Sequence, residues 1–169
     1  RDFERKFSHN NNILFVISPR DEVGGKIATV ETLQALVEIT DRAWRLPHST
    51  QVESLSNFPR IVSDDAAFSV LEMVPSSTGL TPEQAVAIEK EALDDPQVVN
   101  RLLSSDGRAT EINVNFRLPH SASAEVREIP QAAHQFVRQI ESDYPQLQVH
   151  LTGNVMLMTT FNEASHVDA

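Results

Sequence analysis

The sequence contains no cysteine, which excludes disulfides, thiolate nucleophiles and cysteine-ligated zinc. It also has no run approaching the roughly 18 apolar residues that span a bilayer, and no positively charged leader followed by an apolar core. Basic residues are outnumbered by acidic ones, 14 to 24, which gives a formal charge of -10. Because binding to a phosphate backbone needs a positive footprint, nucleic acid is not expected as a partner.

The residues that are present predict one folded unit. The 169 residues are 40% hydrophobic, which is enough for a single domain with a packed core. The acidic residues are spread along the chain, with paired aspartates only at Asp64-Asp65 and Asp94-Asp95, as on a solvated surface. The chain starts at Arg1 without Met and ends inside an amphipathic pattern. We therefore expect it to be a segment of a longer protein.

Three segments have apolar residues at helical spacing, and Pro47, Pro96 and Pro145 follow them as stop signals. In the second segment, Thr81 and Gln84 stand where a capping box places such residues. The predicted helices cover residues 30–45, 81–93 and 126–144. A further short turn of helix is predicted over residues 98–103.

Short apolar or alternating runs predict the strands. The run 13–17 is continuously apolar, as in a central strand buried on both faces, whereas 111–118 alternates apolar and polar residues. The other extended segments predicted are 52–58, a piece that starts near Phe68, and 147–152.

The order of these elements predicts an α+β fold. It reads strand, helix, strand, an inserted helical stretch, and again strand, helix, strand. Two such split β-α-β units make the ferredoxin-like plan, an antiparallel sheet with its helices packed on one face. We expect a single domain over residues 1–169, with its core at about 12–153 and a terminal helix over 154–169.

No sequence motif for catalysis or metal binding is complete. Gly24-Gly25-Lys26 lacks the earlier Gly and the following Ser or Thr of a phosphate loop. None of the six histidines pairs at metal-binding helical spacing, no Ser stands in a GxSxG elbow, and neither aspartate pair fits a calcium loop. His134 and His150 are predicted at the surface. The sequence therefore predicts no catalytic residue, no cofactor and no metal site, and the chain is not expected to be an enzyme.

Four stretches, in this order and spacing, resemble one transporter group: the first extracytoplasmic loop of resistance-nodulation-division (RND) exporters, in the branch of mycobacterial membrane protein large and Patched-like transporters. The stretches are Asn12 to Pro19, Glu31 to Leu36, Val52-Glu53-Ser54-Leu55-Ser56-Asn57-Phe58, and Leu151-Thr152-Gly153-Asn154. The resemblance covers nearly the whole chain from about Asp2. It implies a porter-type domain in the bacterial periplasm, and a terminal helix that leads toward a membrane span of the parent protein.

The resemblance also implies a proton-driven inner-membrane exporter of lipophilic or amphiphilic cargo. The proton-relay carboxylates of such exporters lie in membrane helices, so none is assigned here. The expected partners are the membrane helices and second periplasmic domain of the same transporter, the lipophilic cargo, and further copies of the chain. We expect the edge near Phe58 and Phe68 to contribute to a cargo cleft.

Two other readings fit the same fold. One is a regulatory module that binds a small molecule at a sheet edge or helix interface. The other is a small enzyme such as an acyl-phosphate hydrolase, which needs an Arg loop around phosphate. The segment Ser18-Pro19-Arg20-Asp21 offers the Arg without the surrounding glycines. Because a fold alone does not confer function, the hydrolase ranks last.

Overall fold

The computed structural model describes residues 11–20, 24–75, 79–118 and 123–157. Its main layer is a four-stranded sheet in the order β2-β5-β1-β6, with every neighbouring pair antiparallel. The strands are β1 Asn12–Pro19, β2 Ser49–Glu53, β5 Thr110–Phe116 and β6 Leu147–Thr152. This confirms the predicted α+β fold and the order expected of two split β-α-β units.

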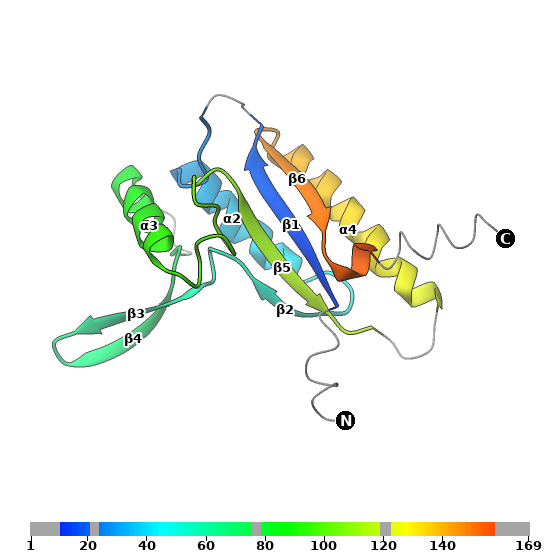
Figure 1. The fold of residues 1–169 in the computed structure, drawn as a ribbon, viewed down its shortest axis with the longest axis horizontal. Coiled ribbons are helices and arrows are strands. Elements are labelled where there is room, and N and C mark those ends of the chain that lie inside the picture. The colour runs from blue at the N-terminus through cyan, green and yellow to red at the C-terminus, as the bar shows by residue number, and fades with distance from the viewer. Residues whose placement is uncertain (1–10, 21–23, 76–78, 119–122, 158–169) are drawn as a thin grey trace.

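Helices α2 (Val30–Ala43) and α4 (Ser123–Asp143) both lie on one face of this sheet (Figure 1). One consequence corrects the expectation for β1. Ile13, Phe15 and Ile17 are fully buried, whereas the alternating residues Leu14 and Val16 are only partly buried. Because the helices cover one face alone, β1 is not buried on both faces.

The third helix, α3 (Pro82–Asp94), lies in the insertion between β2 and β5. The Thr81 side chain accepts a bond from the backbone N–H of Gln84 at 3.2 Å, and the Thr81 N–H donates to Gln84 Oε1 at 2.9 Å. This confirms the capping box. Residues 98–103 form hydrogen-bonded turns and isolated bridges and no regular helix, although the Leu102 N–H donates to the Val98 carbonyl at 2.8 Å as in a helical turn. Of the expected terminal helix, residues 154–157 are helical and the remainder lies outside the described residues.

The insertion also contains a separate two-stranded sheet, β3 (Pro59–Asp64) and β4 (Ala67–Glu72). The two strands form a hairpin around Asp65-Ala66 that projects from the body of the molecule (Figure 1). We call residues 59–72 the arm. The predicted strand over 52–58 is wrong in part, because β2 ends at Glu53 and residues 54–58 form the turn that leads into the arm.

Candidate functional site

The base of the arm is attached to the body through three buried hydroxyl groups. Thr40 on α2 and Ser54 lie 2.8 Å apart between hydroxyl oxygens, as do Ser54 and Ser56. The Ser56 hydroxyl donates to Thr40 at 3.0 Å, and the Thr40 hydroxyl donates to the Leu36 carbonyl at 2.7 Å. All three side chains are almost completely buried. We call these three residues the hydroxyl cluster; it fixes the 54–58 turn against α2.

Asn57 closes the same turn. Its Oδ1 accepts from the backbone N–H of Ser54 at 2.8 Å, and its Nδ2 donates to the Val52 carbonyl at 2.8 Å. Side chains that bond nearby backbone in this way compete with regular strand pairing. This explains why β2 stops at Glu53 although Leu55 and Phe58 are apolar.

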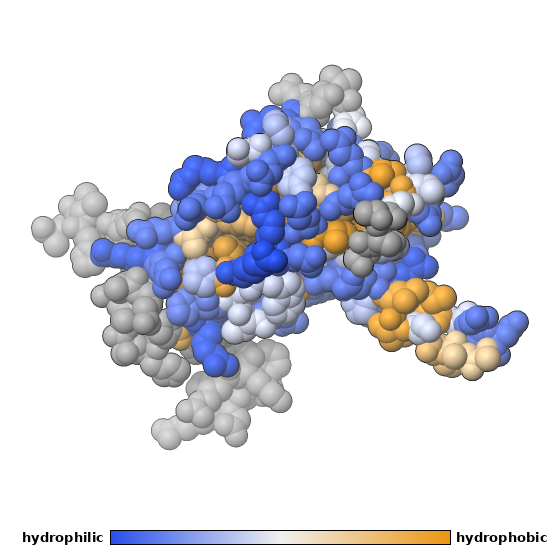
Figure 2. Space-filling view, turned by 180° about the vertical axis from the view of Figure 1, so that it is seen from behind, coloured by the Kyte–Doolittle hydropathy of each residue, from blue (hydrophilic) through white to orange (hydrophobic). Residues whose placement is uncertain are grey.

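The arm exposes large apolar side chains. Phe68 is 84% exposed, Ile61 74%, Val70 68% and Leu71 53%. Ile61 lies opposite Val70, and Phe68 lies opposite Ser63, so Ile61, Val70 and Phe68 share one face of the hairpin. Figure 2 shows hydrophobic side chains gathered on the projecting hairpin. Exposed apolar surface of this kind marks sites that bind a protein, a membrane or a ligand.

An open groove of about 880 Å³ lies between the base of the arm and the segment that follows α3. Phe58, Ile61, Val70 and Met73 supply apolar lining, and the charged lining residues are Glu53, Arg60, Glu91, Asp95 and Arg101. The groove therefore combines an apolar surface with charged groups.

Four of the five charged residues that line the groove form two ion pairs. Arg101 Nη2 lies 2.5 Å from Glu53 Oε1, and Arg60 Nε lies 3.4 Å from Glu91 Oε1. Burial raises the pKa of the Glu111 carboxyl, while the nearby Arg101 charge opposes that rise. Arg60 Nε is buried and makes no hydrogen bond within the described structure. The Arg60–Glu91 pair thus leaves one donor of Arg60 unsatisfied.

The two phenylalanines predicted to contact cargo occupy different environments. Phe58 lines the groove but is only 8% exposed, because it lies in the turn at the base of the arm. Phe68 is on the exposed face of β4 and is not among the groove-lining residues. Ile61 and Val70 connect the two positions, since both line the groove and share the face of Phe68. Sequence reasoning missed Ile61 and Val70, and only the β3–β4 register identifies them.

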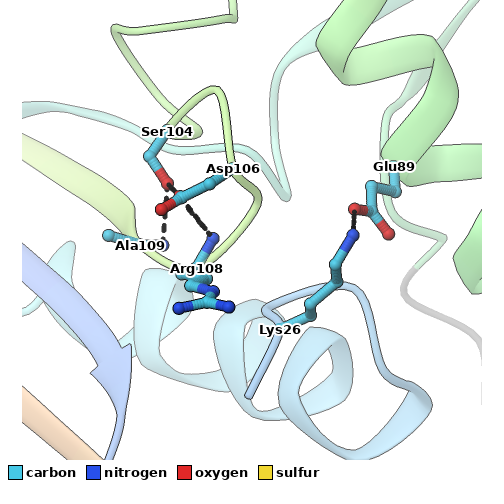
Figure 3. Close-up of polar contacts among 6 residues, drawn as sticks. All are labelled: Lys26, Glu89, Ser104, Asp106, Arg108 and Ala109. Atoms are coloured by element: carbon cyan, nitrogen blue, oxygen red, sulfur yellow. Dashed lines mark hydrogen bonds and ion pairs between the residues drawn. The ribbon is translucent and has the colours of Figure 1, made fainter. Parts of the chain in front are cut away.

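Polar contacts near α3 hold two loops, as Figure 3 shows. Lys26 directly follows Gly24-Gly25, and its Nζ donates to Glu89 Oε1 at 2.7 Å. This ion pair attaches the segment after β1 to α3. In the loop before β5, Asp106 accepts from the Ser104 hydroxyl and from the Arg108 backbone N–H, and these bonds lower its pKa. Both sets of contacts stabilise loops that border the insertion.

Histidines do not gather into a site in the part of the chain that the structure describes. His134 and His150 are exposed, as predicted. His48 Nε2 lies 3.3 Å from Glu128 Oε2. Among the described residues no group of three or more His, Asp or Glu side chains is placed to hold a metal ion.

Fold and surface together define a class: an α+β domain of ferredoxin-like plan with an apolar arm beside an amphipathic groove. The model of the MMPL family matches residues 1–169, the whole chain, so the chain belongs to the MMPL family. This is a family of membrane transporters of the RND superfamily, which confirms the resemblance found in the sequence. A search of curated proteins found no match. None of the described helices is both long and apolar enough to cross a membrane.

Proposed function

We propose that this chain is the periplasmic domain of a proton-driven exporter in a bacterial inner membrane, and that it contacts lipophilic or amphiphilic cargo during passage. Membership of the MMPL family supports the exporter assignment. The single observation that supports cargo contact is the exposed apolar face of the arm, continuous with the groove at its base. In this proposal the membrane helices and a second periplasmic domain of the same transporter complete the pathway.

The arrangement suits a molecule with an apolar and a polar end. An apolar chain fits along Ile61, Val70 and Phe68, where it removes exposed side chains from water. The polar end fits beside Arg60 or Arg101, which also line the groove. Ligand sites commonly combine an apolar lining with a few placed polar groups in this way. The domain acts by binding and release, so it needs no bond-making chemistry.

Of the two predicted contact residues, Phe68 gives the clearer test, because its substitution does not disturb the core. Because Phe58 is buried, Phe58→Ala removes core packing, and a loss of binding could then reflect unfolding. Phe68 is exposed, so Phe68→Ser leaves the core intact. Covering a Phe side chain contributes about 1.5–3 kcal/mol, which corresponds to about tenfold or more in affinity.

The experiment titrates an anionic lipophilic fluorescent dye into the purified 169-residue chain. We expect Phe68→Ser to weaken dye binding by about tenfold or more. Val86→Ser is the matched control, because Val86 is an exposed residue of α3 that does not line the groove. Phe58→Leu should weaken binding with a circular dichroism spectrum like that of the wild type. Equal dye affinity of the wild type and Phe68→Ser would refute cargo contact by the arm.

A further inference from the structure

The outer edge of β3 has free backbone groups in a defined pattern. Within the described residues β3 pairs with β4 alone. The N–H of Met73 donates to the Phe58 carbonyl at 2.8 Å, which marks a bonded pair of the ladder. Bonded pairs recur at every second residue in an antiparallel ladder, so the amides of Ile61 and Ser63 point away from β4. Pro59, which has no N–H, occupies another outward position, as expected at an edge.

The side chains of β3 are self-complementary in charge. Arg60 and Asp64 stand at equal distances on either side of Val62. If two copies of β3 pair antiparallel with Val62 opposite Val62, Ile61 lies opposite Ser63 of the second copy, and both residues present outward amides. The same register sets Arg60 opposite Asp64 of the second copy, twice by symmetry. Opposite charges directly across two strands stabilise a pair of strands.

We propose that the arm is a self-association surface, on which a second copy of this chain adds its β3 strand antiparallel across a two-fold axis at Val62. The pairing converts two hairpins into one four-stranded sheet and closes both β3 edges. A lone two-stranded hairpin is at best marginally stable in water, and an added strand removes that weakness. This inference is independent of cargo binding.

Three further observations support a second copy as the occupant. Arg60 Nε lacks a hydrogen bond, so its guanidinium is not fully satisfied by Glu91. The register brings the acidic turn Asp65-Ala66 of the second copy beside Pro59, at the open groove that Arg60 and Arg101 line. The apolar face also continues across the joint, because Ile61, Val70 and Phe68 of both copies lie on the same side of the enlarged sheet. An isologous contact of this kind gives a closed dimer.

The β4 edge does not have the same complementarity. Its outward positions are Phe68, Val70 and Glu72, and the strand contains no basic residue. Two β4 strands paired side by side therefore gain no opposite-charge contact, in a chain whose formal charge is -10. Charge complementarity selects β3.

Sedimentation equilibrium of the 169-residue chain tests the register by charge exchange. We expect the wild type to dimerise, and Arg60→Asp or Asp64→Arg alone to weaken dimerisation about tenfold or more, because each change sets like charges opposite at both symmetric positions. The double variant Arg60→Asp with Asp64→Arg restores the opposite-charge pairs with unchanged composition, so it should regain the wild-type constant. Arg45→Asp, the same charge change at an exposed residue outside the arm, should have no effect.

Disulfide trapping gives a second readout that does not depend on the charge variants folding well. The chain has no cysteine, so a single introduced thiol can pair only with its copy. Directly opposite residues of a non-hydrogen-bonded pair lie about 4.5 Å apart between Cα atoms, within the range that a disulfide spans. Val62→Cys should form a covalent dimer on mild oxidation, and Ser69→Cys, its cross-strand neighbour on β4, should not. A wild type that stays monomeric, a double variant without recovery, or trapping by Ser69→Cys in place of Val62→Cys would each overturn the proposal.

Discussion

Replacing Thr40 by valine removes one oxygen from the hydroxyl cluster and keeps the shape of the side chain. In the wild type, the Thr40 hydroxyl donates to the Leu36 carbonyl and the Ser56 hydroxyl donates to Thr40. The Ser54 hydroxyl donates to either of its two neighbours in the cluster. Every buried O–H therefore has an acceptor.

In the Thr40→Val variant, the new side chain can accept no hydrogen bond, so the Ser54 and Ser56 hydroxyls have only each other as partners within the cluster. Ser54 and Ser56 still share one bond, and the other O–H is left buried without an acceptor. Leaving a buried donor unsatisfied costs about 1–3 kcal/mol. In Ser56→Ala, by contrast, Ser54 donates to Thr40 and Thr40 donates to Leu36, so no O–H is orphaned and the cost is about 1 kcal/mol. The more conservative change in shape should thus be the more destabilising.

Urea denaturation followed by far-ultraviolet circular dichroism measures the free energy of unfolding of both variants. We expect Thr40→Val to unfold at a lower urea concentration than Ser56→Ala, with the slope of free energy against urea unchanged. A Thr40→Val variant that is as stable as Ser56→Ala, or more stable, would refute the claim that Thr40→Val leaves a buried O–H without an acceptor.

Two further predictions concern a titration and a turn. Burial, and then the hydrogen bond to Glu38, raise the pKa of Tyr144 to about 12, from 10.0. Because the unfolded chain loses this proton first, the stability of the fold should decrease as the pH rises from 10.0 to about 12. The phenolate absorbance of this single tyrosine reports its pKa directly, and Glu38→Gln should lower that pKa. A wild-type pKa of 10.0 would contradict the account. Gly153 has φ +112°, and an added Cβ would lie 2.6 Å from the Asn12 carbonyl oxygen, so Gly153→Ala should cost about 2 kcal/mol or more in urea denaturation. Gly24→Ala, at φ +81° with open space around it, should cost only about 1 kcal/mol, and equal losses would contradict the role of the close contact.

The body of the fold could be predicted from the sequence because its elements each have one buried side. The alternation of β5 and the apolar stripes of α2 and α4 follow directly from the sheet face that the helices cover. The Thr81–Gln84 capping box marks the start of α3 for a local reason, independent of packing. The position of the central strand β1 is predicted correctly, but the predicted burial of its second face is wrong. A continuous apolar run does not show whether one or both faces of a strand are covered.

The arm could not be predicted in the same way. In β3 only Arg60 and Val62 are partly buried, and β4 is exposed throughout, so neither strand has the buried apolar side that a core imposes. Only the extended piece expected near Phe68 corresponds to a strand of the arm, β4. Asp64-Asp65 indicates a solvated loop in the sequence, and the structure shows that the two residues belong to the end and turn of a hairpin. Residue type alone singles out Phe58 and Phe68, but their difference in burial depends on tertiary structure.

The hydroxyl cluster and Asn57 supply what the arm itself lacks. A strand with one buried face has its register set by that face, because a slip of one residue would expose the whole apolar set. The arm has no such face, so its register must be fixed at its base. Val74 donates to the Ser56 carbonyl at 3.1 Å and Met73 to the Phe58 carbonyl at 2.8 Å, and both carbonyls belong to the turn that Asn57 and the cluster hold. The Ser-Leu-Ser-Asn-Phe stretch, residues 54–58, therefore fixes the register of the two strands of the arm from its base. Its polar residues position Ile61, Val70 and Phe68, and they also set the β3 edge on which Arg60 and Asp64 stand.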